Sequence, residues 1–300
     1  MTRNIATLVY WIRERESIRL RRLAGAPPPW TSDPILQIYK FCNIRRRDDR
    51  VSQWVLNHVI ALPTPEGSLG LLYMGMFLAL CRWNNWPPTI QEILDTKLWP
   101  TVYPQWHEMG KLIDARRARK EKAWTGSYIC RAERAIDGHD FGDWGKGAYV
   151  TRIVIQREMN LAAQDLRVAL RTNTRQAVAT VLQRCYGWGS FMAGQVVDDW
   201  SWTPLLKDAT DHYTWAPQGP GSIRGLNRLN GLLLTHRWKD DDYLAELREL
   251  RSEVLEELGP KYADLSLHNL SNCLCEVDKF LRVKNGEGRP RSLYRPETAY

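Results

Sequence analysis

The stretch TRQAVATVLQRCYGWGSFMAGQVVDDW, residues 174–200, holds two short helical patterns on either side of a Gly-Trp-Gly turn. In both halves apolar residues recur three and four positions apart, which predicts two amphipathic helices joined by a sharp bend. The N–H groups at the start of the second helix can hold a DNA phosphate. We expect a helix-hairpin-helix at about 174–200, with DNA contacts from Gly187, Trp188, Gly189 and Ser190. A plain turn between two helices is the alternative.

The rest of the chain has the same helical periodicity, and no segment alternates convincingly with the period of a β-strand. We expect an all-α fold in which residues 1–300 form a single two-lobed helical catalytic unit. The basic segment 285–300 lacks apolar periodicity and is expected to be an ordered strap or a flexible tail. Helices are predicted at 5–23, 49–62, 68–83, 89–98, 105–119, 149–170, 174–185, 191–199, 222–234, 240–258 and 270–283.

The charge of the chain favours a polyanionic partner. Lys and Arg number 42 against 34 Asp and Glu, which leaves a net charge of +8. Nucleic acid is the first candidate, and an anionic membrane surface the weaker second. The most apolar stretch, 69–81, is too short to cross a bilayer and predicts a buried helix. No secretory signal is recognisable at the N-terminus, so we expect a cytoplasmic protein. Six scattered cysteines give no metal-ligand spacing, and no metal is expected.

The Gly-Trp-Gly segment resembles the hairpin of the helix-hairpin-helix DNA glycosylases, in which a catalytic aspartate after the hairpin faces a flipped base. The resemblance implies a glycosylase-like two-lobed fold, with Asp211 as the first candidate and Asp208 as the second. Ser190 and Phe191 stand where bifunctional members carry a lysine nucleophile, which argues against Schiff-base chemistry. The alternative is that both aspartates merely cap a helix.

A second constellation, YKFCNIRRRDDR at 39–50, is rich in arginine. Guanidinium groups bind phosphates through paired hydrogen bonds, so Asn43, Arg45, Arg46 and Arg50 are candidates to hold a pyrophosphate. The alternative is a solvated face whose arginines pair with neighbouring carboxylates.

This block, the stretch PWTSDPIL at 29–36 and the segment LCEVDKFLRVKNGEGRPRSLYR at 274–295 resemble a phage family associated with thymine hypermodification. It is described as the α-glutamyl/putrescinyl-thymine pyrophosphorylase or amino acid:DNA transferase family, related to the helical domain of 5-hydroxymethyluracil DNA kinases. The resemblance implies a pathway in which a kinase pyrophosphorylates 5-hydroxymethyluracil in bacteriophage DNA and a transferase then replaces the pyrophosphate with an amine. The chain contains no G-x-x-x-x-G-K-[ST] phosphate loop, which favours the transferase step.

These resemblances assign roles to particular residues. Asp211 is the candidate base for the attacking ammonium, with Asp208 and His212 as substitutes. Arg224 is expected at the amino acid carboxylate or a DNA phosphate, and Arg289 and Arg291 at the DNA backbone.

The expected partners are double-stranded phage DNA carrying pyrophosphorylated 5-hydroxymethyluracil and a free amino acid, with glycine as the default. The expected place is the cytoplasm of the infected host, with a functional link to a 5-hydroxymethyluracil DNA kinase. No cofactor is implied, because the leaving group is already activated. A DNA glycosylase and a non-catalytic DNA-binding module are the rival functions.

Overall fold

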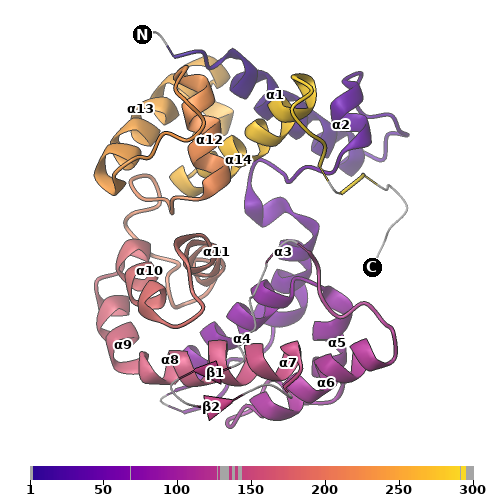
Figure 1. Ribbon diagram of the computed structural model, residues 1–300, viewed down its shortest axis with the longest axis vertical. Helices are drawn as coiled ribbons and strands as arrows, with labels where there is room; N and C mark the ends of the chain where they lie inside the picture. Colours follow the sequence, from indigo (N-terminus) through magenta and orange to yellow (C-terminus); the bar gives the residue numbers. More distant parts are fainter. Residues whose placement is uncertain are drawn as a thin grey trace. The chain divides into compact units, whose positions relative to one another are not determined.

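The computed structural model of the protein is built almost entirely of helices (Figure 1). It describes residues 3–67, 69–126, 128, 135–136, 139–140, 144–290 and 292–294. The chain divides into two compact units. Unit 1 comprises Met1–Asp49 and Asp211–Ala299, and among the described residues unit 2 comprises Arg50–Thr210. Strands β1 (Ala135–Ile136) and β2 (His139–Asp140) form one short antiparallel pair. The all-α expectation is confirmed, apart from this pair.

Unit 1 is organised around its last helix, α14 (Leu267–Lys284), which packs against α12, α1, α13 and α2 (Figure 1). Two glycines on α12 allow the closest of these contacts. A Cβ at Gly225 would lie 2.2 Å from the carbonyl oxygen of Leu274, and one at Gly221 would lie 2.2 Å from Sγ of Cys275. The other elements are α1 (Ala6–Leu23), α2 (Pro34–Ile38), η1 (Arg46–Asp48), α12 (Pro220–Leu229), α13 (Asp240–Leu258) and η4 (Pro260–Tyr262).

Unit 2 has the apolar helix α4 (Gly70–Asn84) at its core, which confirms the buried helix expected at 69–81. The fully buried indole of Trp200 donates to the carbonyl of Gly75 at 3.0 Å, and a Cβ at Gly75 would lie 2.6 Å from its ring. The remaining helices are α3 (Arg50–Val55), η2 (Leu56–Ile60), α5 (Pro87–Asp95), α6 (Trp106–Ala118), α7 (Lys146–Tyr149), η3 (Val150–Arg157), α8 (Glu158–Leu161), α9 (Ala163–Arg171), α10 (Arg175–Arg184) and α11 (Ser190–Trp200).

Several helix boundaries differ from the predicted ones for identifiable reasons. The helix predicted at 149–170 is broken into α7, η3, α8 and α9, with π-helical geometry over Val150–Arg157. The helix predicted at 222–234 begins at Pro220, which suits the first turn, and ends at Leu229, before Gly231 with φ +64°. Helix α2 was not predicted, although Asp33 caps it through Ile35 N–H and Leu36 N–H.

Part of the basic C-terminal segment is ordered against unit 1. Tyr294 N–H donates to the carbonyl of Ile38 at 2.8 Å, and Lys40 N–H donates to that of Ser292 at 3.1 Å. Tyr39 and Leu293 form an isolated antiparallel bridge between these bonds. Residues 292–294 therefore lie as a strap along residues 38–40.

Candidate functional site

The predicted hairpin residues form two helices and a tight turn within unit 2. Thr174 caps α10 by accepting from Ala177 N–H, and α10 packs against α11. Gly187 has φ +83°, a conformation that favours glycine. Trp188 is buried and its indole donates to the carbonyl of Val154 at 2.9 Å, so its side chain anchors the turn to the core.

The start of α11 is open to solvent. Gly189 is the N-cap residue and has no side chain to accept from the first N–H groups, and both Gly187 and Gly189 are exposed. Exposed N–H groups at a helix start attract anions. Phosphate binding by this turn therefore stays a prediction, carried by the backbone and not by the Trp188 ring.

The three candidate bases after the hairpin lie in different settings. Asp208 is an exposed residue of unit 2, and its carbonyl accepts from the side chain of Asn173. Asp211 opens the second part of unit 1, is 6% exposed, and begins a turn in which Trp215 N–H donates to its carbonyl at 3.1 Å. His212 is partly buried, and its carbonyl accepts from Leu267 N–H at 3.0 Å. Asp211 and His212 are thus fixed next to the start of α14.

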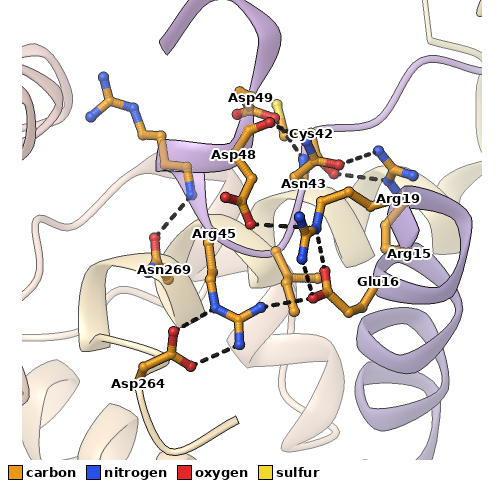
Figure 2. Close-up of polar contacts among 12 residues, drawn as sticks. Arg15, Glu16, Arg19, Cys42, Asn43, Arg45, Asp48, Asp49, Asp264 and Asn269 are labelled. Carbon is orange, nitrogen blue, oxygen red and sulfur yellow. Dashed lines mark hydrogen bonds and ion pairs between the residues drawn. The ribbon is translucent and has the colours of Figure 1, made fainter. Parts of the chain in front are cut away.

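The arginine block forms a dense polar network in unit 1 (Figure 2). Arg45 is held by both carboxylate oxygens of Asp264 at 2.7 Å each and by Glu16 at 3.1 Å. The hydrogen bonds from Arg45 lower the pKa of Asp264. Arg46 is buried, and its N–H donates to the side chain of Asn269 at 3.2 Å. The expectation of a carboxylate-paired face therefore describes Arg45 well, whereas its role toward pyrophosphate stays a prediction.

The other arginines expected at the substrate are Arg50 and Arg224, and those expected at the DNA backbone are Arg289 and Arg291. Arg50 is the first residue of unit 2. Arg224 lies on α12 and donates to the fully buried carboxylate of Asp278 at 3.0 Å, which Arg228 also contacts at 2.9 Å. Arg289 is exposed. Arg291 lies outside the described residues.

Asn43 connects two charged groups of the network. Its side-chain oxygen accepts from Arg15 at 2.7 Å, and its N–H donates to the Asp49 carboxylate at 2.7 Å (Figure 2). Its side-chain amide also donates to the carbonyl of Asp48 at 2.7 Å. The buried guanidinium of Arg15 is further fixed by the carbonyl of Cys42 at 3.0 Å. Asn43 thereby bridges Arg15 and Asp49 through two hydrogen bonds.

Asp49 is the acid of this network whose ionisation is most altered. Although part of the residue reaches solvent, protein surrounds its carboxyl, and this burial raises the pKa of Asp49 to about 6. The hydrogen bond from Asn43 N–H opposes the rise, the nearby carboxylate of Glu276 adds to it, and the charges of Arg15 and Arg46 oppose it. A carboxylate with a pKa near neutrality is suited to accept a proton from a substrate.

Helix α14 supplies two charged groups to the surroundings of Cys42 and Asp49, the carboxylate of Glu276 and the ammonium of Lys279. Glu276 accepts from Cys42 N–H at 3.0 Å and pairs with Lys279 at 2.6 Å. The Lys279 ammonium also donates to the carbonyl of Lys40 at 3.0 Å. Cys42 keeps exposed surface, yet burial of its thiol together with the charges of Asp49 and Glu276 raises its pKa well above the usual value, so it does not serve as a thiolate.

We call Cys42, Asn43, Asp49, Glu276 and Lys279 the carboxylate cluster. Of its members, only Asn43 was predicted from the sequence as a functional residue, and Asp49, Glu276 and Lys279 were not among the candidates. The available signal was the pair of family-like blocks, 39–50 and 274–295, that contribute all five residues. Their side chains meet because 39–50 crosses α14 in unit 1.

Within the ranges that the structure describes, no three His, Cys, Asp or Glu side chains are grouped so as to hold a metal ion. No helix in those ranges is both long and apolar enough to cross a membrane.

Comparison with known proteins relates the chain to a DNA kinase domain family and to one phage protein. The family described as 5-hmdU DNA kinase, helical domain, matches residues 2–289. A protein of Bacillus phage SP10 named 5-hmdU DNA kinase is 24% identical over 288 residues, which cover 89% of this chain and 43% of that protein. The chain thus spans less than half the length of this relative. No solved structure gives a significant match.

Proposed function

Because the chain belongs to the family of the 5-hmdU DNA kinase helical domain, we propose that it acts in the hypermodification of 5-hydroxymethyluracil in phage DNA. The proposed step is the transfer of an amino acid, through its amine, onto a pyrophosphorylated 5-hydroxymethyluracil that is rotated out of the duplex. The family assignment supports the base, and the resemblance of the blocks at 29–36, 39–50 and 274–295 to the amino acid:DNA transferase family supports the transfer step.

In the proposed reaction the amine nitrogen attacks the exocyclic methylene carbon of the base. A carbon–nitrogen bond forms as the carbon–oxygen bond breaks, and pyrophosphate leaves with the electron pair. The attacking ammonium must first lose a proton, which a carboxylate accepts. The protein therefore needs a base near the substrate, donors for the leaving group and a contact to the DNA backbone.

The observation that carries this proposal is the carboxylate cluster. Asp49 has a pKa of about 6, so it is ionised at neutral pH and yet accepts a proton more readily than an ordinary aspartate. Lys279, paired with Glu276 at 2.6 Å, is a cation within the same cluster. We propose Asp49 as the proton acceptor, with Asp211 from the glycosylase-like comparison as the competing candidate.

The hairpin of unit 2 supports the DNA-binding part of the proposal. The exposed start of α11 offers N–H groups to a phosphate without reading sequence. A helix-hairpin-helix glycosylase-like fold and the donor glycine belong to the same proposal. A role beside a 5-hydroxymethyluracil DNA kinase follows, because the substrate must first be pyrophosphorylated.

The test is to incubate the protein with DNA containing pyrophosphorylated 5-hydroxymethyldeoxyuridine and a mixture of amino acids, and to weigh the nucleosides after digestion. We expect a nucleoside heavier than hydroxymethyldeoxyuridine by one condensed amino acid. Asp49→Asn should slow its formation by about 10²–10⁴-fold. Asp241→Asn, at an exposed position on α13, is the matched control and should keep the wild-type rate.

The other outcomes separate the rival candidates. A large loss in Asp211→Asn with normal activity in Asp49→Asn would assign the base to Asp211. Abasic sites would identify a glycosylase, and tight DNA binding with unchanged nucleosides would leave a DNA-binding module. The wild-type rate should also fall as the pH drops below about 6, since the protonated Asp49 cannot accept a proton.

A further inference from the structure

Unit 1 contains a cavity of about 200 Å³ that the carboxylate cluster does not occupy. Its walls include four aromatic rings and two guanidinium groups, from Arg15, Arg22, Trp30, Tyr39, Phe41 and Tyr294. We call it the aromatic pocket. Pockets for drug-sized ligands measure roughly 300–1,000 Å³, so this volume suits a single small ring.

Two groups at the pocket have unused hydrogen-bonding capacity. The hydroxyl of Tyr294 is buried and has no hydrogen-bond partner within the described ranges. The exposed guanidinium of Arg22 stacks over the rings of Trp30 and Tyr294 at 5.2 and 5.6 Å, and no described residue accepts a hydrogen bond from it. A buried hydroxyl without a partner is costly, and a stacked arginine with free N–H groups is suited to bind phosphate.

The walls of the pocket are held in place by the surrounding backbone. The indole N–H of Trp30 donates to the carbonyl of Ala26 at 2.6 Å. The strap at 292–294 fixes Tyr294 beside Tyr39 through its bridge to residues 38–40. A ring that entered the pocket would therefore meet aromatic surfaces that are already positioned, which lowers the entropic cost of binding.

The aromatic pocket is linked to the carboxylate cluster through shared residues. Arg15 lines the pocket and donates to Asn43, whose N–H donates to Asp49. Phe41 lines the pocket as well, and Lys279 of the cluster lies over its ring at 4.5 Å. A ligand ring in the pocket would consequently lie next to the proposed proton acceptor's network.

We propose that the aromatic pocket binds the ring of one pyrimidine nucleotide, with Arg22 at its phosphate and Tyr294 at a polar group of the base. Stacking satisfies the aromatic walls, since every base presents a π-face. The identity of the base as 5-hydroxymethyluracil rests on the proposed function. The nucleotide has two sources, a residue flipped from DNA or a free mononucleotide.

The binding test uses labelled duplexes with 5-hydroxymethyldeoxyuridine or an abasic residue at one position, measured by fluorescence anisotropy on the full chain. We expect the base to tighten binding, and Trp30→Ala to weaken it by roughly 5- to 150-fold, the range for one lost stacking contact. Trp238→Ala is the control, because Trp238 is a partly exposed tryptophan of the same unit that donates to Asn227. Its affinity should stay at the wild-type value.

The Arg22 contact is tested in the same assay with a charge-matched pair. Arg22→Gln should lower affinity and make it less sensitive to salt. Arg13→Gln removes the same charge from an exposed position on the same helix and should have a smaller effect.

Free 5-hydroxymethyldeoxyuridine monophosphate distinguishes the two sources. If saturation-transfer NMR shows that the mononucleotide binds, and the affinity for the duplex is the same with the base as with the abasic residue, the pocket takes a free nucleotide. If neither the base in DNA nor the mononucleotide binds to the wild-type chain, the inference is overturned. Trp30→Phe, which keeps a stacking ring, should retain binding and serves if Trp30→Ala does not fold.

Failure of the pocket and failure of the proposed function give different results. If the wild type binds the nucleotide, Trp30→Ala loses this binding and the wild type transfers no amine, the pocket is supported and the transferase function is overturned. Amine transfer by the wild type at an unchanged rate in a folded Trp30→Ala, with neither the base in DNA nor the mononucleotide bound by the wild type, would support the transferase and overturn the pocket.

Discussion

The two units bury acidic side chains in opposite ways. In unit 2, Asp199 is 1% exposed and accepts from Arg82 with both oxygens at 2.8 Å. Burial alone would lower the pKa of Arg82, but the charge of Asp199 raises it. In unit 1, Asp49 is bound by a backbone N–H at 2.7 Å and its pKa rises to about 6. A matched ion pair fixes a charge in place, whereas an undercompensated carboxyl stays close to gaining a proton.

The largest effect on stability is expected from breaking the matched pair. Asp199→Ala would leave the buried Arg82 without its partner, at a cost of about 3–5 kcal/mol in the free energy of unfolding. Denaturant unfolding, monitored by hydrogen exchange of the amides in α4 and α11, would measure this loss in the free energy of unfolding. Asp208→Ala, at an exposed position in the same unit, should change stability by less than about 0.5 kcal/mol. A cost below about 1 kcal/mol for Asp199→Ala would mean that the Arg82–Asp199 pair contributes little to the stability of unit 2.

A second, smaller effect concerns the pH dependence of unit 1. The pKa of Asp49 is raised from 3.8 to about 6 in the folded protein, so folding favours the protonated form. The contribution is therefore fully present below about pH 4 and is lost as the pH rises through 6. Asp49→Asn resembles the protonated acid, so the variant should lack this loss.

The variant should gain on the wild type by roughly 2–3 kcal/mol between pH 4 and pH 7, the equivalent of about two pKa units. Denaturant unfolding at several pH values gives the comparison. Parallel pH curves for the two proteins would show that Asp49 is compensated as fully as Asp199.

The smallest effect on stability is expected from the backbone conformation of Gly187 in the turn of unit 2. Gly187 has φ +83° with a Cβ site that is sterically tolerable, so Gly187→Ala should cost about 1–2 kcal/mol from backbone strain alone. Gly189 has φ −104° and open space around its Cβ position. Gly189→Ala should therefore be close to neutral, and equal losses for both variants would mean that the turn is held by something other than the Gly187 conformation.

The sequence predicted the helical class and the two helices within residues 174–200 because both depend on local patterns. Apolar spacing marks α10 and α11, and the glycines mark the turn between them. The π-helical stretch at Val150–Arg157 could not be predicted in this way, because its apolar residues recur at spacings that an α-helix also gives. The ring of Trp188 anchors the turn through Val154, a contact between residues 34 positions apart that no local pattern predicts, whereas the DNA contact of this turn stays a prediction.

The site was less predictable because its residues are distant in sequence. Asp49 and Glu276 are separated by most of the chain, and only the packing of residues 39–50 against α14 brings Asp49 beside Glu276. Composition could show an excess of arginine, but it could not show that Arg45 is matched by Glu16 and Asp264. Whether a charge is matched depends on tertiary neighbours, which a pattern of one sequence does not contain.

The division of the chain has a consequence for the order in which the protein is made. Unit 2 is contiguous from Arg50 to Thr210, whereas unit 1 needs both Met1–Asp49 and the segment that begins at Asp211. During synthesis at about 5–20 residues per second, unit 2 can fold while the first segment waits for its partner for tens of seconds. Asp49 meets Glu276 only after α14 has left the ribosome, so the carboxylate cluster is assembled late in synthesis.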